Sequence, residues 1–244
     1  MIKIESLSKS YGSSLVLDNI SLEINDGEFV SILGTFGCGK TTLMKIIGGI
    51  INDYEGTILI DEVKPIKILK KRKIGFCFQK ANLLPWRNVV NNISLPLDLN
   101  GDKNSLDKSM ELLNLVELSG IATKKVSEIS GGTQQLVSIL RSLSLNPDIL
   151  LLDEPFSSID EISRDKLHYK LIKIHKKTKK TIVMVTHSIS EAVFLSDKIV
   201  ILSKDPARII KIINISFSKR DESIKKTKSY LSHINNIKFL LKKQ

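Results

Sequence analysis

The sequence is poor in cysteine and in aromatic residues, and it lacks long apolar runs. Cys38 and Cys77 are its two cysteines, so a disulfide framework is excluded and a reducing compartment fits best. No stretch approaches 18 apolar residues, so we expect no membrane-spanning helix. The first residues alternate like a strand and lack the apolar centre of a signal peptide.

The 244 residues are 42% hydrophobic and 26% charged, which is the composition of a globular chain with one large domain or two small ones. The net charge is +11, and residues 204–244 supply much of it, with eleven Lys or Arg against three Asp or Glu. Such a basic tail suits nucleic acid, an anionic membrane or simply a solvated surface. The solvated surface is favoured, because the tail lacks interleaved aromatics for base stacking.

Short apolar runs alternate with amphipathic stretches along the chain, which predicts a parallel sheet with helices on both faces. We expect strands near the N-terminus at 2–7 and 16–24, and the later strands and helices at 28–33, 40–50, 56–60, 73–78, 88–98, 105–118, 130–145, 148–152, 161–177, 181–186, 188–195 and 198–202. The stretch from about 82 to 145 is mostly helical in this reading, and we expect it to form a lobe of its own.

One glycine-rich segment has the spacing of a phosphate-binding loop. Gly34-Thr35-Phe36-Gly37-Cys38-Gly39-Lys40-Thr41, called the phosphate loop below, fits G-x-x-x-x-G-K-[ST], follows a predicted buried strand and opens a predicted helix. Its glycines allow backbone N–H groups to surround a phosphate, and the helix N-terminus adds positive potential. Lys40 can reach the β- and γ-phosphates, and the Thr41 hydroxyl can bind Mg²⁺.

An acidic pair, Asp153-Glu154, follows the apolar run at 149–152. It lies at the carboxyl end of a predicted central strand, where open α/β sheets bind their ligands. One carboxylate can hold Mg²⁺ through water, and the other can polarise an attacking water.

Together with these two motifs, further ones occur along the chain in an order that resembles that of the ATP-binding cassette (ABC) ATPases. Ser130-Gly131-Gly132 opens a helix, with Gly132 lying 21 residues before Asp153, and the other marks are Tyr11, Gln79, Ser158-Ile159-Asp160 and His187. The resemblance covers roughly residues 1–215. It implies an α/β fold with a P-loop NTPase core, that is, a parallel sheet flanked by helices, together with an N-terminal antiparallel β subdomain and a helical subdomain.

The resemblance also implies domain boundaries. We expect an ABC ATPase domain over 1–217, with its helical subdomain at about 82–145, and a basic tail over 218–244. The tail lies outside the resemblance. A helix is expected in it over 223–241, with five apolar residues on one side: Ile224, Tyr230, Leu231, Ile234 and Ile237.

The residue roles that the resemblance implies centre on ATP and Mg²⁺. The general base would be Glu154, the γ-phosphate contact His187, and the sensor of metal and water Gln79, with Lys40 as the phosphate-binding cation. Tyr11 would stack on adenine. The remaining nucleotide contacts would be Gly34, Thr35, Phe36, Gly37, Cys38, Gly39, Lys40, Thr41 and Thr42, and the metal-binding residues Thr41, Gln79 and Asp153.

Four residues would act on the nucleotide of a second copy: Ser130, Gly131, Gly132 and Asp160. The resemblance therefore implies a head-to-tail homodimer that closes over two ATP molecules and opens after hydrolysis. We expect the partners to be transmembrane permease subunits and, indirectly, an external solute-binding protein, with no nucleic acid. The expected location is the cytoplasmic face of the cell membrane.

The segment Leu83-Leu84-Pro85-Trp86 is similar to that of importers of nitrate, sulfonates, taurine and thiamine precursors. We therefore favour an importer subunit, and its solute would be a small anion such as nitrate or a sulfonate, or a thiamine precursor. Two alternatives stay open: a soluble ABC ATPase acting on ribosomes or nucleic acid, and an inactive regulatory cassette.

Several positions depart from the family pattern. Thr35 and Phe36 replace a proline and a small polar residue, and Ser188 replaces an aspartate. The arginine that the family usually has near Leu136 is missing. These departures are compatible with slow ATP hydrolysis. Lys40 and the acidic pair remain, so we predict that hydrolysis is retained. Cys38, at a helix N-terminus, is expected to be a reactive thiol that ATP protects from alkylation.

Overall fold

The computed structural model describes residues 1–217 and 219–242, so the predicted tail at 218–244 has its first residue and its last two outside the described residues. The chain divides into two compact units. The first unit comprises Met1–Lys71 and Lys180–Gln244, and the second unit comprises Arg72–Lys179. The expected subdomain at 82–145 lies inside the second unit, and its boundaries remain a prediction.

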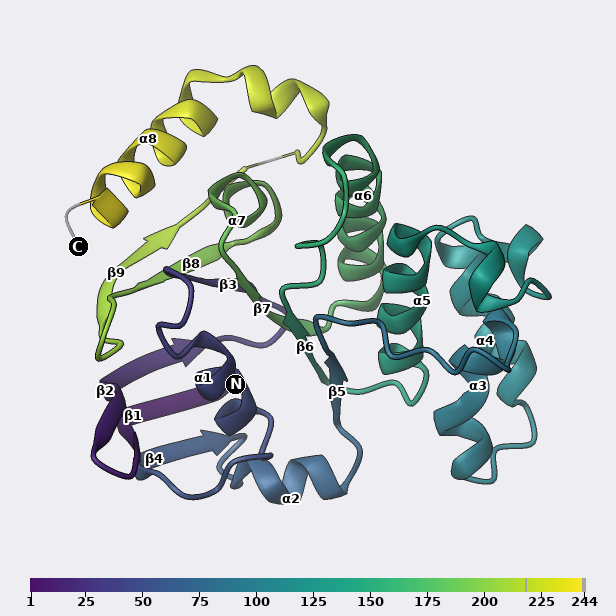
Figure 1. Cartoon of the computed structure of the whole chain (residues 1–244), viewed down its shortest axis with the longest axis horizontal. Helices are drawn as coiled ribbons and strands as arrows, with labels where there is room; N and C mark the ends of the chain where they lie inside the picture. The colour runs from purple at the N-terminus through teal and green to yellow at the C-terminus, as the bar shows by residue number, and fades with distance from the viewer. Residues whose placement is uncertain (218, 243–244) are drawn as a thin grey trace. The chain divides into compact units, whose positions relative to one another are not determined.

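The N-terminal part of the first unit is a three-stranded antiparallel sheet in the order β2-β1-β4 (Figure 1). Alternation of apolar and polar residues puts Ile2 and Ile4 on the core face of β1, and a register shift between Ile4 and Leu7 puts Leu7 there too. Each of the three is at most 1% exposed. This sheet is the antiparallel β subdomain that the sequence predicts. Its strands are β1 (Ile2–Tyr11), β2 (Ser14–Ile24) and β4 (Glu55–Ile60).

The rest of the first unit is built on parallel strands. The neighbours β7, β3 and β8 are parallel, and β9 pairs with β8 in the antiparallel sense. All residues of β3 and β7 are buried, as their continuous apolar runs predict. The strands are β3 (Phe29–Leu33), β7 (Thr181–Thr186), β8 (Lys198–Leu202) and β9 (Ile209–Asn214).

Helices cover these strands. Helix α1 (Lys40–Ile47) packs against β7, and α7 (Ile189–Leu195) packs against β3 and β7. Helix α2 (Pro65–Lys70) packs against β4. Helix α1 begins at Lys40, near the end of the phosphate loop, so the strand–loop–helix order that the motif requires is present.

The tail differs from the single helix expected over 223–241. It forms a 3₁₀ turn, η3 (Glu222–Lys226), and then α8 (Lys228–Lys242), which packs against α7. Thr227 separates the two because its backbone is extended, with ψ 146°, and its hydroxyl accepts a hydrogen bond from the Tyr230 N–H at 3.2 Å. Of the five apolar residues expected on one side, Ile224, Tyr230 and Ile237 are buried, whereas Leu231 is 49% exposed.

The second unit has a parallel strand pair, β5 (Ile74–Cys77) with β6 (Ile149–Asp153), and a group of helices. Gly75 lets α5 approach β5, because a Cβ there would lie 2.3 Å from the Ser142 carbonyl oxygen. The helices are α3 (Val89–Leu99), α4 (Ser105–Leu115), α5 (Gly131–Leu143) and α6 (Glu161–Thr178), with 3₁₀ turns η1 (Ser119–Ile121) and η2 (Val126–Glu128).

Across residues 1–217 and 219–242, none of the helices combines the length and the apolar character needed to span a bilayer.

Candidate functional site

The phosphate loop joins β3 to α1 in a conformation that requires glycine. Gly37 and Gly39 have φ of +78° and +96°, which favours residues without a Cβ. A Cβ on Gly39 would also lie 2.9 Å from Cγ1 of Val16. The loop therefore turns tightly before α1, whose N-terminal N–H groups and partial positive charge suit a phosphate.

Lys40 holds the phosphate loop together from within. It is 4% exposed, and its Nζ donates hydrogen bonds to the carbonyl oxygens of Gly34 at 3.1 Å and Thr35 at 2.7 Å. The ammonium group is thus fixed inside the loop that is predicted to surround the phosphates. Thr41 and Thr42, both half-buried, occupy the first turn of α1 directly after it.

The unusual residues of the loop have different surroundings. Phe36 is 90% exposed, so its ring does not fill the phosphate-binding concavity of the backbone. The Thr35 hydroxyl oxygen is buried and has no hydrogen-bond partner among the described residues. The expectation of a reactive Cys38 is wrong: the thiol is 1% exposed, and burial raises its pKa against the opposing effect of Lys40.

Tyr11 ends β1 and is half-exposed, and the ammonium group of Lys9 lies 4.8 Å from the centre of its ring. Lys9 is itself 6% exposed and pairs with Asp53 at 2.8 Å. One side of the ring thus packs on a fixed cation, and the side chain still exposes aromatic surface of the kind that stacks on a base.

His187 follows β7 and is exposed, and the residues beside it are anchored. The Thr186 hydroxyl donates to Oε2 of Glu191 at 2.7 Å and accepts from the Ser188 N–H at 3.0 Å. The Ser188 hydroxyl caps α7 by accepting from the Glu191 N–H at 3.3 Å. Ser188, which stands where the family usually has an aspartate, therefore supplies an N-cap as an aspartate can. Residues 186–188 are called the His187 turn below.

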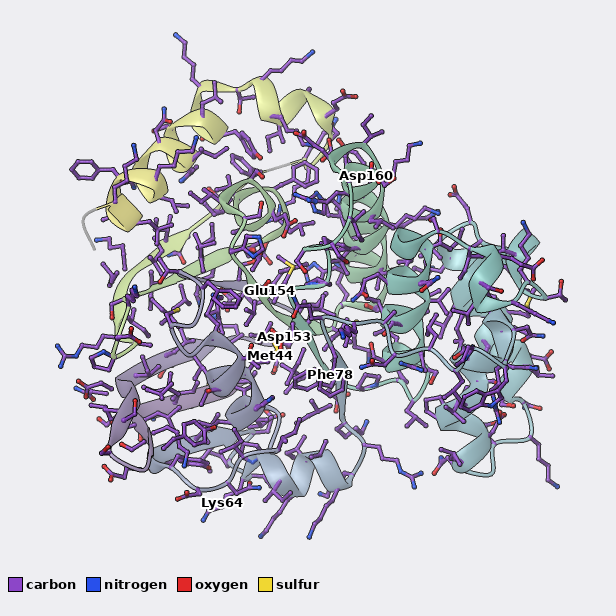
Figure 2. The ribbon with its side chains drawn as sticks, in the orientation of Figure 1. Met44, Lys64, Phe78, Asp153, Glu154 and Asp160 are labelled. Atoms are coloured by element: carbon purple, nitrogen blue, oxygen red, sulfur yellow. The ribbon has the colours of Figure 1, made fainter. Side chains whose placement is uncertain are left out.

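The acidic pair lies at the end of β6 in the second unit (Figure 2). Asp153 is 8% exposed, and Glu154 has φ +44°, an uncommon conformation for a residue with a side chain. The Glu154 carbonyl oxygen accepts hydrogen bonds from the N–H of Ser157 at 3.3 Å and from its hydroxyl at 3.1 Å. Residues 154–157, called the Glu154 turn, thus hold the backbone in a conformation that costs about 1–3 kcal/mol.

Gln79 is linked to the Glu154 turn. Its Nε2 donates to the Ser157 hydroxyl at 3.3 Å. The structure therefore brings the predicted metal-sensing glutamine together with the predicted general base through Ser157. Sequence reasoning missed Ser157, although it lies directly before the Ser158-Ile159-Asp160 mark.

The Ser130 motif forms the N-terminus of α5. The Ser130 hydroxyl accepts from the Thr133 N–H at 3.3 Å and caps the helix. Gly131 is exposed, and a Cβ on Gly132 would lie 3.1 Å from Cδ1 of Leu167 in α6. The first residue of α5 is thus exposed, while its second residue, the buried Gly132, allows close packing against α6.

Two glutamines make hydrogen bonds at the start of α5, near Leu136, where the family usually has an arginine. Gln134 donates from Nε2 to the carbonyl oxygens of Val126 at 3.1 Å and Ile129 at 3.2 Å. Gln135, 5% exposed, donates to the Phe78 carbonyl oxygen at 3.1 Å, next to Gln79. The start of α5 is therefore tied to the segment before it and to the end of β5.

Asp160 is the N-cap of α6 (Figure 2): its Oδ1 accepts a hydrogen bond from the Ser163 N–H at 2.9 Å. This bond to the Ser163 N–H holds the pKa of the exposed carboxyl below its usual range. The side chain thus stays ionised at neutral pH and available at the surface of the second unit.

The predicted site residues fall into two sets, one in each unit. The first unit carries Tyr11, the phosphate loop with Thr42, and His187. The second unit carries Gln79, Ser130, Gly131, Gly132, Asp153, Glu154 and Asp160. Within the second unit, hydrogen bonds join Gln79 to the Glu154 turn, and the packing of Gly132 joins α5 to α6.

A family model described as "ABC transporter" matches residues 17–157. The aliphatic sulfonates import ATP-binding protein SsuB of Bacillus thuringiensis subsp. konkukian is 43% identical over 218 residues, which is 88% of this chain and 86% of that protein. An uncharacterized ABC transporter ATP-binding protein of Methanocaldococcus jannaschii is 40% identical over 243 residues, 97% of this chain and 90% of that protein. The taurine import ATP-binding protein TauB of Escherichia coli K12 is 36% identical over 222 residues, with coverage of 90% and 86%.

Among solved structures, an ATP-binding cassette in a dimeric post-hydrolysis state with ADP and Pi aligns with a TM-score of 0.76 at 33% identity. The alignment covers 89% of this chain and 100% of that one. A second dimeric structure, of a bacterial ABC transporter cassette, has the same TM-score at 32% identity. The predicted α/β P-loop NTPase fold is confirmed.

Proposed function

Because the chain belongs to the ABC transporter family and is an ATPase of that type, we propose that it energises an importer of small sulfonated solutes. The observation that carries the proposal is its similarity, along nearly nine tenths of its length, to a sulfonate import ATP-binding protein. Similarity to a taurine import protein supports the same solute class, because taurine is also a sulfonate. The reported relatives give no such support to nitrate, to a thiamine precursor or to an ATPase of ribosomes or nucleic acid.

We assign phosphate binding to the first unit. The N–H groups of the phosphate loop and the ammonium group of Lys40 would hold the β- and γ-phosphates, and Tyr11 would stack on adenine. The enclosed position of Lys40 supports this assignment, because its charge acts where the backbone already presents donors. His187 would contact the γ-phosphate from a turn that Glu191 anchors.

Three groups fit a magnesium ion by their donor chemistry: the hydroxyl of Thr41, the carboxylate of Asp153 and the amide oxygen of Gln79. All three are oxygen donors, which this ion prefers, and few protein ligands suit an ion that also takes phosphate and water oxygens. Among the described residues, no group of three or more His, Cys, Asp or Glu side chains is gathered as a metal cluster. When bound, the ion would neutralise charge on the transferring phosphoryl group.

Hydrolysis is assigned to the Glu154 turn. Glu154 would accept a proton from water as the water oxygen bonds to the γ-phosphorus and the bond from that phosphorus to the β-phosphate oxygen breaks. The products are ADP and inorganic phosphate, and the proton passes to solvent from the carboxyl group. The hydrogen-bonded link from Gln79 to this turn supports a role for Gln79 in placing the water.

Coupling to transport would use two copies of the chain and a permease. The first turn of α5 and the carboxylate of Asp160 would reach the nucleotide of the second copy, and dimeric structures of similar cassettes support this assembly. Trp86, 77% exposed between β5 and α3, is a large aromatic suited to a permease contact. The protein would thus lie at the cytoplasmic face of the membrane through its permease, which receives solute from an external binding protein.

Affinity capture of the tagged chain from detergent-solubilised native membranes tests the importer role. We expect a polytopic permease to co-purify, and its binding protein to gain thermal stability with sulfonates rather than with nitrate. Trp86→Ala should weaken capture, whereas Phe239→Ala, which removes an exposed aromatic from α8, should not. Capture of ribosomal or nucleic-acid-bound proteins without a membrane protein would contradict the proposal.

A further inference from the structure

The His187 turn is fixed to the first turn of α7. Glu191, 3% exposed, accepts the Thr186 hydroxyl at 2.7 Å, and its N–H donates to the Ser188 hydroxyl at 3.3 Å. These bonds lie on both sides of His187 in the chain. The position of the imidazole therefore depends on the position of α7.

Helix α7 cannot hold that position by itself. It has seven residues, about two turns, and isolated helices shorter than about 12 residues are marginal in water. Its last carbonyl groups also have no partners within the helix. The contacts that α7 receives from other elements must therefore fix it.

Arg220 holds the C-terminal end of α7. Its Nη1 donates to the Leu195 carbonyl oxygen at 2.8 Å, and its Nη2 donates to the Ser196 carbonyl oxygen and to Oδ1 of Asp197, both at 2.7 Å. The other carboxylate oxygen of Asp197 accepts the Phe29 N–H at 2.9 Å. Arg220 thus ties the end of α7 to the start of β3, the strand that leads into the phosphate loop.

Two further residues of the tail contact α7. The Tyr230 hydroxyl donates to the Ser190 carbonyl oxygen at 3.2 Å, one turn from His187. The ammonium group of Lys225 lies 5.1 Å from the centre of the Phe194 ring. Tyr230 is 4% exposed, and its ring lies 6.3 Å from that of Phe217, so its hydroxyl is presented from a packed position.

We infer that Arg220 and Tyr230 of the C-terminal tail are positioning residues for ATP hydrolysis: they hold α7 at both ends and thereby place His187. The inference rests on the proposed role of His187. It assigns the tail, which the family resemblance does not cover, to the function of the first unit. It also accounts for the burial of Tyr230 in a basic helix.

The test is steady-state ATP hydrolysis by the full-length purified protein. Tyr230→Phe keeps the ring and removes the hydroxyl, and we expect kcat to fall about three- to tenfold, with KM for ATP and the thermal midpoint unchanged. Arg220→Lys keeps the charge but loses the forked donors, and it should lower kcat by about tenfold or more. Tyr54→Phe, at a half-buried tyrosine far from α7 in the sequence, is the matched control and should behave as wild type.

A double-mutant cycle separates positioning from general destabilisation. If the tail acts through His187, Tyr230→Phe should have no further effect on kcat in a His187→Ala background. An equal loss in both backgrounds, or a wild-type kcat for both tail variants, would overturn the inference and leave the proposed function intact. A wild-type kcat for His187→Ala would instead refute the role of His187, and the inference with it.

Discussion

The phosphate loop and the Glu154 turn are both tight connections after a buried strand, but different forces hold them. The phosphate loop is stabilised from within, by glycines at positive φ and by the bonds of Lys40 to two of its own carbonyl oxygens. The Glu154 turn carries a side-chain-bearing residue at φ +44°, and Ser157 joins it to Gln79 from another segment. The phosphate loop is thus held by local contacts, whereas the Glu154 turn also contacts a segment that is distant in the chain.

This difference gives the two regions different sensitivities to substitution. In the loop, the backbone itself should be the vulnerable part, and exposed side chains should matter little. At the turn, small changes in surrounding side chains should reduce turnover more than stability. The following substitutions separate these cases.

Gly39→Ala should have the largest effect. The new Cβ would meet Val16 at 2.9 Å in a backbone conformation that disfavours it, so the free energy of unfolding should fall by about 2–4 kcal/mol. Gly120→Ala is the control, since Gly120 has no heavy atom within 4 Å of a built Cβ. Urea unfolding followed by circular dichroism measures both, and equal small losses would show that the loop is not fixed by its backbone.

The buried thiol of Cys77, at the end of β5 in the second unit, should make the free energy of unfolding depend on pH. Cys77 is 0% exposed, and its thiol donates a hydrogen bond to the Ser138 hydroxyl, with 3.5 Å between sulfur and oxygen. Burial raises the pKa of this thiol to about 11. Below the ordinary thiol pKa of about 8.5 its contribution is fully present. Above that pH the unfolded thiol ionises first, so stability is lost progressively up to about pH 11.

From pH 7 to 10, the free energy of unfolding should therefore fall by about 1–2 kcal/mol more in the wild type than in Cys77→Ala. Comparison with this variant cancels the titration of lysines and tyrosines that the two proteins share. Parallel curves for the two proteins would mean that the thiol is accessible in the folded state.

Ser157→Ala tests the link between Gln79 and the Glu154 turn. It removes the hydroxyl that accepts from Gln79 and donates to the Glu154 carbonyl oxygen, so kcat should fall about three- to tenfold. Stability should change by less than about 1 kcal/mol. Ser127→Ala, at an exposed serine of the same unit, should leave both quantities unaltered. A fall in stability with unchanged kcat would assign Ser157 to folding alone.

Phe36→Ser should have the smallest effect. The ring is 90% exposed, so ATP affinity should stay within about twofold and the free energy of unfolding within about 0.5 kcal/mol. Titration with a fluorescent nucleotide analogue checks the affinity. A change above tenfold would show that the side chain, and not the backbone alone, shapes the loop.

The same contrast explains what the sequence could predict. The strand–loop–helix order and the tight turn of the phosphate loop were predictable, because spacing and glycine content determine them locally. The link from Gln79 to Ser157 was not, since it joins residues 78 apart in the chain. The positive φ of Glu154 was not predicted either. The reactivity of Cys38 was predicted wrongly because its position at a helix N-terminus suggested a low pKa, whereas burial dominates.

The tail illustrates a further limit. Its apolar spacing predicted a helix, but the break at Thr227 arises from a local cap that competes with helix continuation. The contacts of Arg220 with the end of α7 join residues 23 to 25 apart in the chain, and nothing in the spacing of the basic residues distinguished this arginine from its neighbours.

Nucleotide binding and turnover of Glu154→Gln test the central claim most directly. The amide keeps the size of the side chain and cannot accept the proton of water, so kcat should fall by at least about 100-fold while ATP affinity stays within about twofold. Glu111→Gln, at an exposed acid on α4, should match the wild type in both. Undiminished hydrolysis by Glu154→Gln would contradict the assignment of cleavage to the Glu154 turn.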